Sequence, residues 1–304
     1  MLSRVVVVYS ERYACDIGRH VFPTVKYRMA LERLLAAGVI SPGDVVEPRM
    51  PSGDELRCVH TADYLDDLEA LRWSARTMYS ELPLSEAIVD AYRLAAGGTL
   101  DAARAALDGA AAVHLGGGFH HAFAARAEGF CYLNDLAVAI RVLQHEGRIR
   151  RAAVVDLDVH QGNGTAHVFE GDEDVFTLSI HQERNYPAFK ERSDLDVGLD
   201  DHTGDEDYLR ALGGALERVW SFAPELLLYQ AGADPYVHDQ LGGLALSCEG
   251  LERRDRAVLE GCVGRRIPAV VTLGGGYALD IEDTARIHAT TARVAIAAVQ
   301  AARA

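Results

Sequence analysis

The sequence has few cysteines, and their arrangement excludes two common ways of stabilising a small domain. The five cysteines are odd in number, widely scattered, and never form a C-x-x-C pair. A structural zinc framework needs paired cysteines, and a disulfide-stapled secreted domain needs an even and dense set. The cysteine pattern therefore favours a reducing compartment, and we expect a cytoplasmic protein.

Long apolar runs and an excess of basic residues are also missing. No stretch approaches the roughly 18 apolar residues of a membrane helix, and the N-terminal apolar run is too short for a signal peptide. With 30 Lys and Arg against 45 Asp and Glu, the formal net charge is −15. This balance disfavours nucleic-acid and membrane partners. It is more typical of a soluble protein than of one that attracts a cationic substrate.

The sequence does contain short apolar runs that alternate with longer Ala- and Leu-rich segments. Continuous β-branched runs are typical of parallel strands buried on both faces, and the longer segments have helical spacing. The runs predict strands over residues 5–9, 112–115, 153–157, 175–180, 226–230 and 269–273. The longer segments predict helices over about 26–37, 85–107, 132–147, 205–222, 249–264 and 282–302. Because no linker or repeat interrupts the alternation, we expect one doubly wound α/β domain over 1–304.

Chemically active residues follow five of the predicted strands. Because the carboxyl ends of parallel strands meet at one edge of a sheet, we expect these residues to share a site. Glycines among them allow the backbone to approach a ligand closely. The segments are G-G-G-F-H-H (116–121), D-V-H-Q-G-N-G (158–164), His181, A-G-A-D-P (231–235) and G-G-G-Y (274–277).

A metal site is the first prediction from these segments. Asp156, Asp158 and His160 alternate along one strand end, so an extended backbone would point them to one side. Asp158 and His160, with Asp234 from another strand end, form a set of two carboxylates and one imidazole. Three protein ligands with an open fourth position are typical of a catalytic zinc site, where water is bound and activated. A D-x-H segment on its own is a capping aspartate beside a surface histidine as often as it is a metal site. The prediction of a metal site therefore depends on Asp234 and the histidine pair at the other strand ends.

Proton transfer is the second prediction. His120 and His121 are candidates for general base and acid, because histidine titrates closest to neutral pH. Each needs a partner on its far ring nitrogen, for which Asp156 and Asn163 are the candidates. Tyr277 offers an O–H group that can stabilise a developing oxyanion. Taken alone, a histidine pair after glycines is more often an ordinary turn, and a tyrosine after a strand more often packs in the core.

Five segments also carry a family resemblance. They are GGGFHHA (116–122), GFCYLND (129–135), DLDVHQGNGT (156–165), QAGADPYVHDQLGGLALS (230–247) and LGGGYA (273–278). In this order, from about residue 5 to 290, the sequence resembles the zinc-dependent histone deacetylase superfamily. The short passage between Leu199 and Tyr208 is most similar to class IV histone deacetylases. The resemblance implies a single-domain, three-layer arginase/deacetylase fold around a mostly parallel eight-stranded sheet.

The resemblance also implies the metals. Asp158, His160 and Asp234 would hold one Zn²⁺ per chain, and the sequence leaves open whether zinc or iron is the native metal. A structural K⁺ would lie beside them. Its ligands would be the side chains of Asp156 and Ser179 and the carbonyls of Asp158, His160 and Ile180.

Catalytic and substrate-binding roles follow in the same way. His121 would be the general base and acid, His120 its electrostatic partner, and Tyr277 the group that polarises the scissile carbonyl. Asp156 would stand behind His120, while Asn163 stands where many members have a second Asp behind His121. A neutral amide would support a charged imidazole less than a carboxylate. The expected substrate-binding residues are Phe119, Gly129, Phe130, Tyr186, Leu241, Gly275 and Gly276.

The implied activity is removal of acyl groups, acetyl or longer, from the lysine side chains of a peptide or protein, with hydroxamates as inhibitors. Leu241 stands near the position of an acidic gatekeeper in polyamine-selective members, which favours acyl-lysine over a small acylated amine such as an acetylpolyamine. Two rivals remain open. The first is a two-metal ureohydrolase, which needs more Asp and His ligands than this segment has, because Gln161 and Asn163 are neutral amides. The second is a non-catalytic acyl-lysine-binding module, which would be expected to lack one of the histidines, a metal ligand or Tyr277.

Overall fold

Runs of Val, Ala and Leu form the centre of the molecule. The computed structural model describes residues 5–302, and these contain one sheet of eight strands in the order β2-β1-β3-β8-β7-β4-β5-β6. Every neighbouring pair in the sheet is parallel. The strands are β1 (Val6–Val8), β2 (Val45–Val46), β3 (Ala111–His114), β4 (Ala152–Asp156), β5 (Val175–Gln182), β6 (Leu195–Leu199), β7 (Leu226–Gln230) and β8 (Ala269–Thr272).

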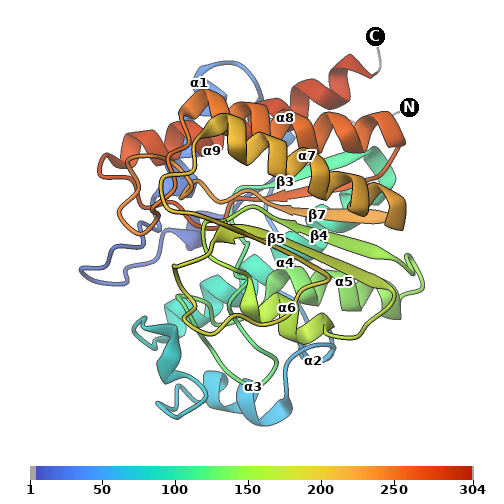
Figure 1. Ribbon diagram of the computed structural model, residues 1–304. Helices are drawn as coiled ribbons and strands as arrows, with labels where there is room; N and C mark the ends of the chain where they lie inside the picture. Colours follow the sequence, from blue (N-terminus) through green and yellow to red (C-terminus); the bar gives the residue numbers. More distant parts are fainter. Residues whose placement is uncertain (1–4, 303–304) are drawn as a thin grey trace.

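Helices cover both faces of this sheet (Figure 1). One layer contains α1, α7, α8 and α9, and the opposite layer contains α4, α5 and α6, with α2 and α3 at its outer edge. The helices are α1 (Lys26–Ala36), α2 (Gly53–Arg57), α3 (Ala62–Glu69), α4 (Glu86–Gly109), α5 (Asp135–His145), α6 (Asn163–Phe169), α7 (Asp205–Phe222), α8 (Cys248–Arg265) and α9 (Ile281–Ala301).

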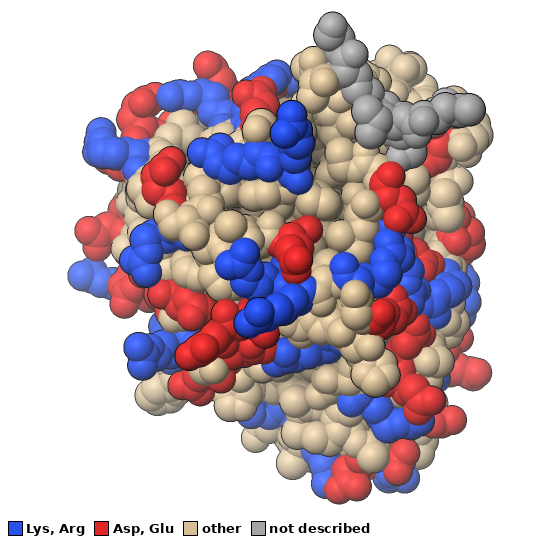
Figure 2. Space-filling view, turned by 90° about the vertical axis from the view of Figure 1, so that its right-hand side faces the viewer, with Lys and Arg blue, Asp and Glu red and all other residues tan. Residues whose placement is uncertain are grey.

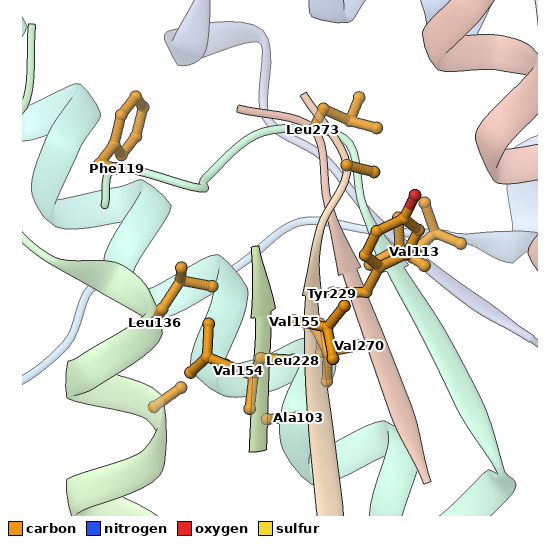
Figure 3. Packing of buried hydrophobic residues seen from close by; sticks show 14 of the residues in the cluster. Ala103, Val113, Phe119, Leu136, Val154, Val155, Leu228, Tyr229, Val270 and Leu273 are labelled. Atoms are coloured by element: carbon orange, nitrogen blue, oxygen red, sulfur yellow. The ribbon is translucent and has the colours of Figure 1, made fainter. Parts of the chain in front are cut away.

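The core lies on both sides of the central strands. Val154 and Val155 of β4, Leu228 of β7 and Val270 of β8 are all essentially inaccessible to solvent. Figure 3 shows these side chains between the strands and the neighbouring helices, with Leu136 of α5 pointing toward the sheet. Full burial of an aliphatic side chain contributes about 1.5–3 kcal/mol, so this layer supplies much of the driving force for folding. The result is a rigid support beneath the carboxyl ends of the strands.

The predicted fold class is confirmed: the chain is a single three-layer α/β domain with an eight-stranded sheet. The sheet is entirely parallel within the described residues, whereas a mostly parallel one was expected. All six predicted strands are present. β2 and β6 were not predicted, because β2 has only two residues and the residues of β6 alternate between partly buried and exposed.

One expectation about the metal segment is wrong. β4 ends at Asp156, so Asp158 and His160 lie in the loop that follows it and not on an extended strand. The two-residue alternation therefore does not orient these three side chains. Asp156, the last residue of β4, contacts His120 through its side chain, and the loop that follows brings Asp158 and His160 close to Asp234.

The surface agrees with the composition. On the face shown in Figure 2, Lys and Arg are interspersed with Asp and Glu, and they form no broad basic area there. Within residues 5–302, no helix is both long enough and apolar enough to cross a bilayer. The five cysteines are free.

Candidate active site

The loops after β3, β4, β7 and β8 meet at one edge of the sheet and enclose a pocket of about 190 Å³. His121 follows β3, His160 follows β4, and Tyr277 follows β8, so the walls come from segments far apart in the sequence. The residues that line this pocket are Glu81, His121, Gly129, Phe130, His160, Asn185, Tyr186, Leu241 and Tyr277.

Asp158, His160 and Asp234 form a buried cluster beside this pocket. One potential ligand atom from each lies within 4.8 Å of the others. His160 Nδ1 is 3.0 Å from Asp158 Oδ1 and 3.3 Å from Asp234 Oδ2. The structure therefore brings together all three residues that the sequence indicated as metal ligands.

The cluster fits a divalent cation. Asp234 Oδ2 is buried, and no group among residues 5–302 donates a hydrogen bond to it. Burial and the nearby Asp158 carboxylate raise the pKa of Asp234, and this effect exceeds the lowering effect of His160. The Gly275 N–H donates to Asp158 Oδ2 at 2.9 Å, and a Cβ at Gly275 would overlap the Asp234 carboxylate. Two carboxylates and one imidazole are a donor set that zinc accepts.

The two adjacent histidines have different partners. His120 Nδ1 lies 2.6 Å from Asp156 Oδ2, and His121 Nδ1 lies 2.7 Å from Asn163 Oδ1. Burial alone would lower the pKa of His120, but the Asp156 and Asp158 carboxylates raise it to about 9. Burial lowers the pKa of His121 well below its ordinary value, and the His120 ring lowers it further. The pKa values of the two histidines therefore shift in opposite directions, although their ring centroids are only 4.1 Å apart.

Tyr277 is held at the wall of the pocket by its backbone. Its N–H donates to Asp239 Oδ2 at 2.6 Å. Burial, with the Asp234 carboxylate nearby, raises the pKa of Tyr277 well above its ordinary value, so the phenol keeps its proton and remains a donor. The fully buried Lys26 lies 5.3 Å from the Tyr277 ring centroid and donates to the Gly274 carbonyl at 2.7 Å. Lys26 was not singled out by the sequence analysis.

Four of the residues expected to bind the substrate, Gly129, Phe130, Tyr186 and Leu241, line this pocket. Gly129 and Phe130 both have positive φ angles, +51° and +63°, and present Phe130 to the pocket. The Tyr186 ring lies 5.0 Å from the His121 ring, nearly perpendicular to it. Leu241 also lines the pocket.

The other expected substrate-binding residues lie elsewhere. Phe119 packs on Tyr92, with ring centroids 4.4 Å apart, and lines a separate inner cavity. Gly275 contacts the candidate metal ligands, and Gly276 adopts a φ of +143° next to it. None of these three residues lines the pocket beside the metal-ligand cluster, and their role in substrate binding stays a prediction.

The residues expected around potassium also lie together. Asp156 of β4 is the register partner of Ser179 on β5, and Ile180 follows directly. Asp156 Oδ1 accepts from the Asp158 N–H at 3.2 Å, and Ser179 Oγ lies 2.9 Å from His181 Nδ1. Asp156 and Ser179 therefore lie side by side on neighbouring strands, just before the loop that carries Asp158 and His160.

The sequence analysis missed several residues of the site. Glu81 and Asn185 line the pocket, and the carboxylate of Glu128 contacts Asn163. Only Glu128 had a usable signal, because it directly precedes the G-F-C motif while a neutral Asn163 occupies the place of the second aspartate. Glu81 and Asn185 come from loops without any such motif.

Comparison with known proteins agrees with this geometry. The histone deacetylase domain family model matches residues 20–294. The chain is 42% identical to an uncharacterized protein of Picosynechococcus sp., covering 95% of this chain and 97% of that protein. It is 32% identical to histone deacetylase 2 of Arabidopsis thaliana, covering 95% of this chain and 78% of the relative.

Solved structures give the same result. The crystal structure of an HDAC homolog complexed with SAHA has a TM-score of 0.83 and 28% identity, covering 96% of this chain and 84% of that one. The chain therefore belongs to the histone deacetylase family of hydrolases. The superfamily predicted from the sequence is confirmed, and the similarity to class IV stays a prediction.

Proposed function

We propose that this protein is a zinc-dependent deacylase that hydrolyses acyl groups from lysine side chains. The observation that carries the proposal is the buried Asp158, His160 and Asp234 cluster, in which one carboxylate oxygen has no donor, beside a pocket lined by His121 and Tyr277. When bound, the metal supplies the Lewis acidity that polarises a carbonyl and acidifies water. Asp158, His160 and Asp234 would hold the metal, and zinc accepts a donor set of two carboxylates and one imidazole.

His121 and His120 have different roles in the proposed reaction. His121, neutral at the start, takes a proton from the attacking water at Nε2, because its Nδ1 faces Asn163. The water oxygen bonds to the amide carbon, and the C–N bond breaks as His121 returns the proton to the leaving amine. His120, held charged by Asp156, stabilises the negative charge that develops nearby. The products are a carboxylate and a free lysine side chain.

Tyr277 has the role of oxyanion donor. Its O–H donates to the carbonyl oxygen, which becomes negative as the water attacks. The buried ammonium group of Lys26 lies over the aromatic ring of Tyr277, and this cation–π contact helps to hold the phenol beside the pocket. Asp156, Ser179 and the neighbouring carbonyls would bind K⁺ as a structural ion and hold the metal loop in place.

Tyr277→Phe tests this role most simply. Removal of one oxyanion donor typically lowers kcat by about 100- to 1000-fold. We expect that loss on an acetyl-lysine peptide, with zinc content by mass spectrometry and melting temperature unchanged. Near-full activity of the variant would show that Tyr277 does not serve as the donor.

The lining of the pocket supports acyl-lysine as the substrate class. Leu241, together with Phe130 and Tyr186, gives the wall an apolar surface that fits the methylene chain of lysine and lacks a carboxylate at position 241 for a polyamine. Acetyl-, trifluoroacetyl-, octanoyl- and myristoyl-lysine peptides, assayed beside N-acetylputrescine, test this. We expect kcat/KM to be higher for at least one acyl-lysine peptide than for N-acetylputrescine, and hydroxamates such as SAHA to inhibit. The reverse preference would identify a small-amine deacylase.

A further inference from the structure

Glu128 lies behind the histidine that we propose as the base. Its Oε1 is 2.6 Å from Asn163 Nδ2, and Asn163 Oδ1 is 2.7 Å from His121 Nδ1. Asn163 and His121 are buried, and the side chain of Glu128 is 18% exposed. Glu128, Asn163 and His121 therefore form a continuous hydrogen-bonded chain that runs from the edge of the site to the proposed base.

The chemistry of Glu128 fixes the direction of these hydrogen bonds. A carboxylate only accepts, so the Asn163 atom that faces Glu128 must be the amide nitrogen. The amide oxygen of Asn163 must then face His121, and it can only accept from an Nδ1–H. A neutral His121 with its proton on Nδ1 has a free lone pair on Nε2. This is the tautomer that a general base needs.

Glu128 is itself held in place. The Arg126 guanidinium donates to its Oε2 at 3.1 and 3.2 Å, and the Tyr186 hydroxyl donates to its Oε1 at 3.3 Å. The backbone of Glu128 pairs with Cys131 in both directions, which closes the tight turn that carries Gly129 and Phe130. Glu128 thus connects the wall of the substrate pocket to the proposed base.

We propose that Glu128 is a positioning residue for catalysis: through Asn163 it supplies the negative end of the relay and locks His121 in the Nδ1–H tautomer. Asn163 alone cannot do this, because its amide can turn by 180° and offer its NH₂ group to His121 instead. The inference rests on the proposed function of His121 as the base. It adds a carboxylate to this site where the sequence shows only a neutral amide.

A double-variant cycle tests the relay. In Glu128→Ala, the Asn163 amide is free to turn, so we expect kcat to fall about 10- to 100-fold with little change in KM. Asn163→Asp alone places two carboxylates side by side, and repulsion between them impairs the enzyme too. In the double variant the new carboxylate at position 163 accepts directly from His121 without a repelling neighbour, so kcat should exceed that of either single variant. Glu173→Ala, at an exposed glutamate, is the matched control and should keep wild-type activity.

Two results overturn the inference: Glu128→Ala with wild-type kcat, or a double variant no more active than Glu128→Ala. Melting temperature and zinc content separate a loss of fold or metal from a loss of base orientation. If Glu128→Ala does not fold, Glu128→Gln replaces it. Its amide can also donate to Asn163, so the same fall in kcat and the same rescue by Asn163→Asp are expected.

A readout without substrate keeps this test independent of the proposed function. Side-chain ¹⁵N NMR of His121, assigned with His121→Gln, distinguishes Nδ1–H from Nε2–H. We expect Nδ1–H in the wild type and a mixture in Glu128→Ala; Nε2–H in the wild type contradicts the relay. If the relay is present but His121→Gln retains full deacylase activity, the proposed role of His121 fails and the orientation by Glu128 stands.

Discussion

At the scale of single residues, the site depends on what faces the far nitrogen of each histidine. His120 has a carboxylate at 2.6 Å and His121 has an amide at 2.7 Å, so the pKa values of two adjacent imidazoles shift in opposite directions. Asp156 raises the pKa of His120 against the effect of burial, while burial lowers the pKa of His121. One histidine can then accept a proton while its neighbour supplies positive charge.

Gly129→Ala tests how closely the base is packed. A Cβ at Gly129 would lie 2.7 Å from His121 Cδ2, and the φ of +51° disfavours any side chain. We expect His121 to be displaced and kcat to fall by about 100-fold, because misplacement of a reacting group by about 1 Å can have that effect. The measurement is kcat on an acetyl-lysine peptide.

Gly171→Ala is the matched control for this variant. Gly171 has a φ of +75°, but a Cβ at this position would meet no atom within 4 Å, so the two variants share only the backbone strain. Gly171→Ala should lower the free energy of unfolding by about 1–2 kcal/mol and leave kcat unchanged. Equal activities of Gly129→Ala and Gly171→Ala would mean that contact with His121 is unimportant.

Part of this arrangement follows from residue types alone. The sequence offers Asp156 and Asn163 as candidate partners of the two histidines, because both belong to the polar segment that ends a predicted strand. It does not identify Lys26, nor the contact that Glu128 makes. Both depend on loops whose paths are set by tertiary packing, and no local pattern encodes them.

At the scale of elements, helix α8 contacts the two loops that carry the proposed metal ligands. Arg254, which is fully buried, donates to the carbonyls of Gly232 at 2.7 Å and Leu157 at 3.3 Å, each close in sequence to a proposed metal ligand. Its charge is paired with Asp255, 2.8 Å away, and Asp255 also accepts from Thr291 of α9. This buried network connects two helices to the loops after β4 and β7.

Arg254→Met should therefore lower both the stability of the protein and its affinity for zinc. It leaves the Asp255 carboxylate buried without its counter-charge, which typically lowers the free energy of unfolding by about 3–5 kcal/mol. It also frees the two carbonyls, so zinc affinity should fall as well. Urea unfolding and zinc titration measure the two effects.

The control lies one residue earlier on the same helix. Arg253 pairs with Glu206 on the surface, and its side chain is 45% exposed. Arg253→Met should change neither stability nor zinc affinity appreciably, since exposed ion pairs contribute little. If Arg254→Met behaved like Arg253→Met, the network would not be supporting the metal loops.

The elements themselves were largely predictable. Long buried segments such as α4 and α9, and apolar strands such as β4 and β7, have patterns that hold over many residues. Short elements have no such extended pattern. α6 has only seven residues and lies within the metal-loop motif, so no periodicity marks it, although it places Asn163 beside His121.

At the scale of the whole molecule, the parallel sheet creates the site. Each strand ends at the same edge, so residues from positions 120 to 277 meet there although they come from loops that are far apart in the sequence. The rule that ligands bind at the carboxyl ends of parallel strands predicts this edge from the strand pattern alone. The order of the strands and the walls of the pocket do not follow from it, because they depend on how the helices pack on each face.

Zinc titration of the metal-stripped protein, with hydrolysis of an acetyl-lysine peptide as the readout, tests the central claim most directly. A site made of Asp158, His160 and Asp234 predicts that activity is absent without metal, rises linearly with added zinc, and reaches its plateau at about one equivalent per chain. Full activity of the stripped protein, or a plateau only at about two equivalents, would contradict the account.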